Sequence, residues 1–130
     1  MQLYTVEEAR GLLPRVIPVL ERMRDAFLHL RALQAATAAE ARGAMGDGHL
    51  VHSPLVTGGE DQGEKHRRAL SEAATQLEEW GIEVKDPERG LIDFYHRRGG
   101  EVVLLCYMLG ERGIEFWHTR SGGFAGRQPI

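Results

Sequence analysis

Apolar residues recur along the first third of the chain at alternating spacings of three and four, as in an amphipathic helix. Thr5 and Glu8 form a capping-box pattern at its start. Pro14 and Pro18 lie inside the pattern, and each removes a backbone donor, so we predict one long, kinked helix over residues 1–42. The apolar stripe comprises Leu12, Val16, Val19, Met23, Ala26, Leu30 and Leu33.

The pattern then breaks over residues 43–63, which contain six glycines and Pro54 without a sustained period. Such a composition is typical of a flexible loop. The helical period returns from Leu70 to Trp80, and Gly81 is placed to end the helix. We therefore predict a second helix over residues 64–81 that pairs antiparallel with the first.

From Ile82 the period changes to that of extended strands. A short strand at 82–84 precedes strands at 91–97, 101–109 and 114–119, and residues 99–100 form a two-residue hairpin turn. Residues 82–119 thus predict an antiparallel β-meander of three to four strands, followed by an irregular tail at 120–130. The predicted fold class is α+β, a single domain over residues 1–130 with a long helical hairpin packed on the meander.

The turn positions also predict the register of the strands. With the first turn at 99–100, Asp93 lies opposite Cys106. With a tight second turn centred on 111–112, Cys106 lies opposite Trp117 and His118 belongs to the other face. Asp93 and His118 are therefore predicted to lie on opposite faces and not to form a dyad.

The two predicted faces differ in character. One is almost wholly apolar, and we expect it to pack on the helices. The other is too apolar to be solvated and too acidic to be plain core, so we expect the C-terminal tail with Phe124, or another subunit, to cover it. This second face carries Leu91, Asp93, Tyr95, Leu104, Cys106, Met108, Glu115 and Trp117.

Several segments follow a recognisable pattern. Residues 5–14 read Thr-x-x-Glu-Ala-x-x-Leu-Leu-Pro, and further matching segments lie at 83–86, 90–94, 103–111, 117–118 and 123–127. In these segments the chain resembles the prokaryotic family catalogued as domain of unknown function 2203. The resemblance covers nearly the whole chain apart from the glycine-rich stretch at 43–60, and it implies no particular activity.

Composition narrows the class of protein further. The chain has 130 residues, 42% of them hydrophobic and 27% charged, which suits one globular domain. Its net charge of −3 makes a nucleic-acid partner unlikely on sequence grounds, and no apolar run approaches the ~20 residues that cross a membrane. The N-terminus lacks a signal-peptide pattern and Cys106 is the single cysteine, so we expect a cytoplasmic protein.

Four residues are candidates for ligand binding. Asp93, Glu115 and Arg127 would suit a metal or polar ligand, with structural ion pairs as the alternative. His118 is a candidate ligand or general acid/base, with a core histidine bound to a carbonyl as the alternative. Cys106 is predicted to be an inert buried thiol with no histidine beside it.

Apart from these candidates, the sequence indicates no metal site, and it indicates no cofactor. His49 and His52 lie near Asp47, but zinc needs about four ligands of fixed geometry, so we interpret them as a solvated loop. Residues 122–127 are rich in glycine but do not lie between a strand and a helix, as a phosphate loop would.

Two functions of different classes follow, and the sequence does not decide whether the protein is an enzyme. The first is a non-enzymatic interaction module that forms a homodimer or higher homo-oligomer, because the predicted first helix is about twice as long as its partner. Light scattering that shows a strict monomer would contradict it. The alternative is a small metal- or polar-ligand-binding protein, with or without enzymatic activity, that uses the acidic residues of the meander and Arg127.

Overall fold

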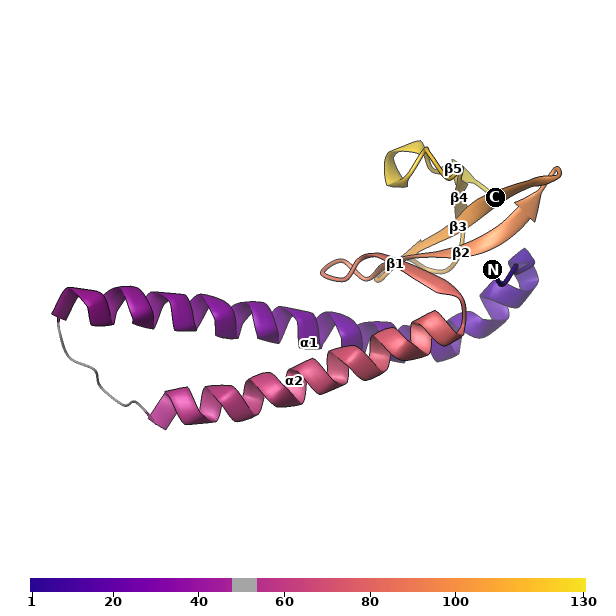
Figure 1. The fold of residues 1–130 in the computed structure, drawn as a ribbon. Helices are drawn as coiled ribbons and strands as arrows, with labels where there is room; N and C mark the ends of the chain where they lie inside the picture. The colour runs from indigo at the N-terminus through magenta and orange to yellow at the C-terminus, as the bar shows by residue number, and fades with distance from the viewer. Residues whose placement is uncertain (48–53) are drawn as a thin grey trace.

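The fold consists of two long helices and one antiparallel sheet (Figure 1). We obtained it as a computed structural model, which describes residues 1–47 and 54–130. The sheet has the order β1-β2-β3-β4-β5, so each strand pairs with the next, which confirms the predicted α+β class. The elements are α1 (Val6–Asp47), α2 (Pro54–Glu79), β1 (Ile82–Asp86), β2 (Leu91–Arg98), β3 (Glu101–Met108), β4 (Phe116–His118), the 3-10 helix η1 (Phe124–Gly126) and β5 (Gln128–Pro129).

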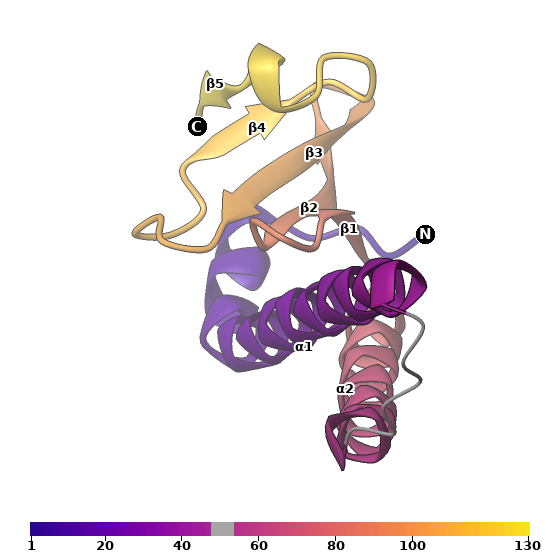
Figure 2. The same cartoon turned by 90° about the vertical axis from the view of Figure 1, so that its left-hand side faces the viewer.

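Helix α1 begins with the predicted capping box. The backbone amide of Thr5 donates to the Glu8 carboxylate at 2.9 Å, and the amide of Glu8 donates to the Thr5 hydroxyl at 3.0 Å. Pro14 and Pro18 both lie within the helix. Figure 2 shows the first turns of α1 set at an angle to the rest, as expected where proline interrupts the backbone ladder.

Both helices extend into residues 43–63, where the sequence pattern predicts a loop. Helix α1 continues to Asp47 and α2 already begins at Pro54, so the loop prediction was wrong for these turns. A glycine costs about 1 kcal/mol relative to alanine in a helix, which continuing backbone hydrogen bonds offset. His49 and His52 lie outside the described residues.

The helices form the predicted antiparallel hairpin, and they extend well beyond the sheet (Figure 1). The sheet packs near the end of the hairpin where α1 begins and α2 ends. The distal turns of α1 are exposed, as the alanine-rich sequence there suggests. In the part of the chain that the structure describes, neither helix is long and apolar enough to cross a bilayer.

The first hairpin has the predicted register. Gly99 and Gly100 occupy the turn with φ of 57° and 84°, a conformation that glycine adopts without the strain of a side chain. Arg98 lies opposite Glu101, and Asp93 lies opposite Cys106. The two glycines therefore specify which residues of β2 and β3 share a face.

The register of β4 against β3 differs from the prediction by one residue. Cys106 lies opposite Phe116 rather than Trp117, and Leu104 lies opposite His118. The tight turn occurs earlier, because the amide of Glu111 bonds the carbonyl of Met108 at 3.0 Å. A longer connection then leads to β4. This one-residue slip exchanges the faces of every β4 side chain.

One face of the sheet packs on the helices, as predicted for β2 and β3. Phe94 is fully buried there, and its ring contacts Tyr4 edge-on with centroids 5.3 Å apart. In β4 the prediction was wrong, because Trp117 packs against this core while Phe116 and His118 belong to the other face. The core residues are Tyr4, Ala9, Leu13, Val16, Leu20, Met23, Ala73, Leu77, Ile82, Ile92, Phe94, Leu105, Tyr107 and Ile114.

The C-terminal tail is more ordered than predicted. It forms η1 and then β5, which pairs with β4 through Phe116 opposite Pro129. Two residues are too few to produce a strand pattern in a sequence, so only the pairing reveals β5. Phe124 lines a pocket on the second face, so the tail does cover part of this face.

Candidate metal centre

Three side chains that can bind a metal meet on the second face of the sheet. Asp93 comes from β2, Cys106 from β3 and His118 from β4, and their exposed fractions are 0%, 1% and 2%. One potential ligand atom from each lies within 4.8 Å of the other two. The prediction that Asp93 and His118 lie on opposite faces was wrong, because it rested on the tight turn at 111–112.

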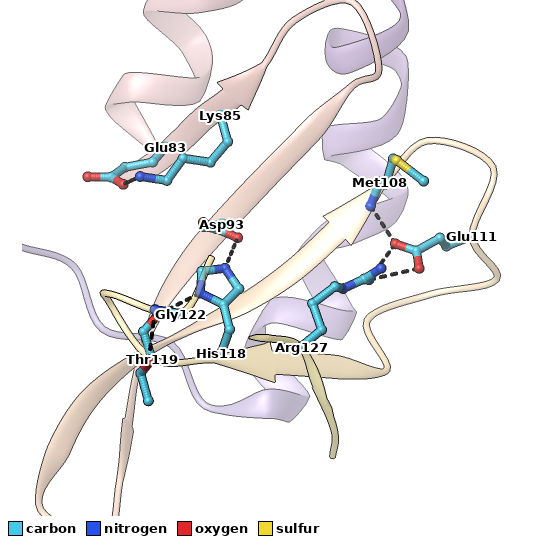
Figure 3. A network of polar contacts seen from close by, with 9 residues as sticks. All are labelled: Glu83, Lys85, Asp93, Met108, Glu111, His118, Thr119, Gly122 and Arg127. Carbon is cyan, nitrogen blue, oxygen red and sulfur yellow. Dashed lines mark hydrogen bonds and ion pairs between the residues drawn. The ribbon is translucent and has the colours of Figure 1, made fainter. Parts of the chain in front are cut away.

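His118 is held by hydrogen bonds at both ring nitrogens (Figure 3). Its Nδ1 lies 2.7 Å from the carbonyl oxygen of Thr119, and its Nε2 lies 3.0 Å from Oδ1 of Asp93. A carbonyl only accepts, so Nδ1 carries a hydrogen. Nε2 therefore points toward Asp93 and Cys106, and one proton is shared in the hydrogen bond between Nε2 and the Asp93 carboxylate.

The second oxygen of Asp93 lacks a donor. Among the described residues, Oδ2 is buried and has no hydrogen-bond partner. An unsatisfied buried polar atom of this kind costs about 1–3 kcal/mol, and more when it is charged. A ligand at this oxygen would remove that cost.

Cys106 is buried, as predicted, but it does not lie apart from a histidine. Burial, and then the negative charge of Asp93, raise the pKa of the Cys106 thiol to about 12. The thiol is thus protonated at neutral pH in the protein as it stands. A bound cation would oppose both effects, because metal ligation stabilises the thiolate.

The raised pKa of Cys106 predicts a loss of stability in alkali. The unfolded thiol titrates near pH 8.5–9, so between about pH 9 and 12 the unfolded chain loses a proton that the folded chain keeps. The free energy of unfolding should therefore fall with rising pH, by up to about 1.4 kcal/mol per unit from this group. Urea unfolding of wild type and Cys106→Ser, with a chelator present, measures the difference. Parallel pH profiles would contradict the prediction.

A pocket of about 220 Å³ opens beside the three side chains. Asp93, Cys106 and His118 line it, and the tail contributes to its wall. The remaining lining residues are Lys85, Leu91, Leu104, Arg120, Gly123 and Phe124. The cluster is therefore buried but borders a space that a small molecule can occupy.

Arg127 belongs to the same face but binds Glu111, which is not among the predicted site residues. Its guanidinium nitrogen Nη2 lies 2.8 Å from both oxygens of Glu111 (Figure 3). The guanidinium also lies between the rings of Phe116 and Phe124, 4.2 Å and 4.6 Å from their centroids. Arg127 thus ties the tail to the sheet beside the pocket.

Glu115 does not join this group. It is exposed, and it lines a different pocket with Arg10 and Ile114. The predicted combination of Asp93, Glu115 and Arg127 is therefore not assembled, whereas Asp93 and His118 meet directly. Cys106, predicted to be an inert thiol with no histidine beside it, is instead the third member of the cluster with Asp93 and His118. Its predicted pairing with Asp93 was the signal in the sequence that could have placed it there.

The comparisons with known proteins agree with the resemblance in the sequence. The model of the family described as "Uncharacterized conserved protein (DUF2203)" matches residues 2–130, and the chain belongs to this family. No curated protein and no solved structure matches the chain.

Proposed function

We propose that this protein binds one transition-metal ion, Zn²⁺ foremost, through Asp93, Cys106 and His118. The observation that carries the proposal is the convergence of a carboxylate, a thiol and an imidazole within 4.8 Å, all buried. Carboxylate, thiolate and imidazole are the three ligand types that zinc takes in proteins. The proposal is thus the metal-binding form of the sequence alternative, with Cys106 in place of Glu115 and Arg127.

The surroundings of His118 support this assignment. Histidines that bind a metal through one ring nitrogen usually donate the other N–H to a carboxylate or backbone carbonyl, which orients the ring. Here Nδ1 faces the Thr119 carbonyl at 2.7 Å and leaves Nε2 directed at the cluster. A metal would replace the proton between Nε2 and Asp93.

The number of protein ligands suggests a site that also binds a small molecule. Structural zinc sites have four protein ligands, whereas sites with three leave a position for water or substrate. Asp93, Cys106 and His118 supply three, and the pocket adjoins them. A metal at this position would supply Lewis acidity to whatever occupies the pocket.

The homo-oligomeric interaction module stays a prediction. The length difference between the helices supports it less than the sequence suggested, because α2 has 26 residues and pairs with more of α1 than predicted. Light scattering remains its test.

Titration of the chelator-treated protein with Co²⁺ and Zn²⁺ tests the proposal. We expect one ion per chain, and for Co²⁺ a thiolate-to-metal charge-transfer band. Cys106→Ser should abolish this band. His118→Gln should weaken binding more than about 100-fold, because even the outer hydrogen-bond partners of metal ligands are worth 10–100-fold.

His96→Gln is the matched control. Like His118, His96 is a histidine of the sheet whose Nδ1 bonds a backbone carbonyl, here that of Tyr4 at 2.7 Å. Its side chain is half-buried, whereas His118 is fully buried. It lies on the opposite face, so its variant should bind the metal as the wild type does. A folded wild-type protein that takes up neither metal would overturn the proposal.

A further inference from the structure

We infer that the pocket beside the metal centre takes a small monocarboxylate, whose carboxylate binds the metal and faces Arg120. This inference rests on the proposed function, because it places the carboxylate on the metal held by Asp93, Cys106 and His118. It adds the chemical class of the ligand. Three observations support it: the charges of the pocket wall, its apolar residues and its size.

The charges favour an anion with a single negative charge. A divalent metal is neutralised by the Asp93 carboxylate and the Cys106 thiolate. Lys85 pairs with Glu83 at 2.6 Å, so these two groups also cancel. Arg120 remains: in the part of the chain that the structure describes it forms no ion pair, and its charge acts on Glu83 only at longer range. The site therefore has a surplus of one positive charge.

The position of Arg120 suits this role. It follows β4 by two residues and lines the pocket together with the metal ligands. Its guanidinium lies 5.8 Å from the centroid of the Tyr95 ring, and it contacts the sulfur of Met1 at 3.6 Å. Neither contact is with a negatively charged group, so the guanidinium N–H groups of Arg120 can still donate to a carboxylate.

The rest of the wall restricts the size and character of the ligand. Leu91, Leu104 and Phe124 present apolar surface, which suits a short hydrocarbon group attached to the carboxylate. The volume of about 220 Å³ equals roughly seven water molecules of the liquid, and a molecule as large as a nucleotide would not fit. Propionate and acetate have the matching charge and fit within this volume.

The experiment uses the full chain loaded with Co²⁺, whose visible d–d absorption reports on its ligands. Acetate and propionate are added at constant ionic strength, with acetamide and propionamide as neutral counterparts of equal shape. We expect a saturable change of the d–d spectrum with the carboxylates and none with the amides. Arg120→Gln should weaken the carboxylate affinity about tenfold while the Co²⁺ stoichiometry stays the same.

Arg97→Gln serves as the matched control, since Arg97 is an exposed arginine of β2 that does not line the pocket. It should bind acetate as the wild type does. This inference would be overturned if the spectrum of the Co²⁺-loaded protein did not change with the carboxylates, or if Arg120→Gln and wild type bound them with equal affinity. Neither result would contradict the proposed metal site. Failure to take up Co²⁺ would instead overturn the proposed function, and this inference with it.

Discussion

Replacement of His118 by leucine is expected to lower the free energy of unfolding by about 3–5 kcal/mol, because it leaves a buried carboxylate without its histidine partner. Asp93 is fully buried, and the ring of His118 hydrogen-bonds its Oδ1 at 3.0 Å. Removal of the ring would leave the carboxylate with the Cys106 thiol, which is only a weak donor. Urea unfolding in the presence of a chelator measures the loss without any contribution from a metal.

The double variant Asp93→Leu/His118→Leu separates this cause from simple packing damage. Removing both polar partners removes the unpaired charge, and such replacements are often neutral or stabilising. We therefore expect the double variant to be more stable than His118→Leu alone, yet unable to bind Co²⁺ or Zn²⁺. A double variant as unstable as the sum of the two single variants would show that the pair is not energetically coupled.

Arg127→Ala is the second substitution with a large expected effect. Arg127 and Glu111 are both mostly buried, so loss of the guanidinium leaves the Glu111 carboxylate with only the backbone amide of Met108 at 2.7 Å. Breaking a buried pair from one side costs about 3–5 kcal/mol, and the stacking on Phe116 and Phe124 is lost as well. Chemical unfolding measures the total.

An exposed ion pair provides the control for Arg127. Arg89 contacts Asp86 at 3.7 Å and its side chain is 67% exposed, so Arg89→Ala should cost less than about 1 kcal/mol. In Arg127→Ala the amides of Gly126 and Arg127 should also exchange hydrogen faster, because the tail loses its anchor. Equal stability of the two variants would contradict a structural role for the Arg127–Glu111 pair.

Local patterns predicted most of the fold. The capping box at Thr5 and Glu8 and the glycine pair at 99–100 act through neighbouring backbone atoms, so the sequence alone determines them. The pairing of Asp93 with Cys106 followed from the second of these. The extent of α1 and α2 did not follow, because the cost of glycine in a helix is small enough for continued hydrogen bonding to offset it.

The candidate site depended on contacts between residues distant in sequence. Asp93 and Cys106 could be paired from the sequence, since a two-residue glycine turn fixes the register on both of its sides. The addition of His118 required the position of the second turn, and Glu111 influences that position through its bonds to Met108 and to Arg127, sixteen residues away. Because strand side chains alternate with a period of two, this single-residue difference decided whether His118 faced the helices or Asp93 and Cys106.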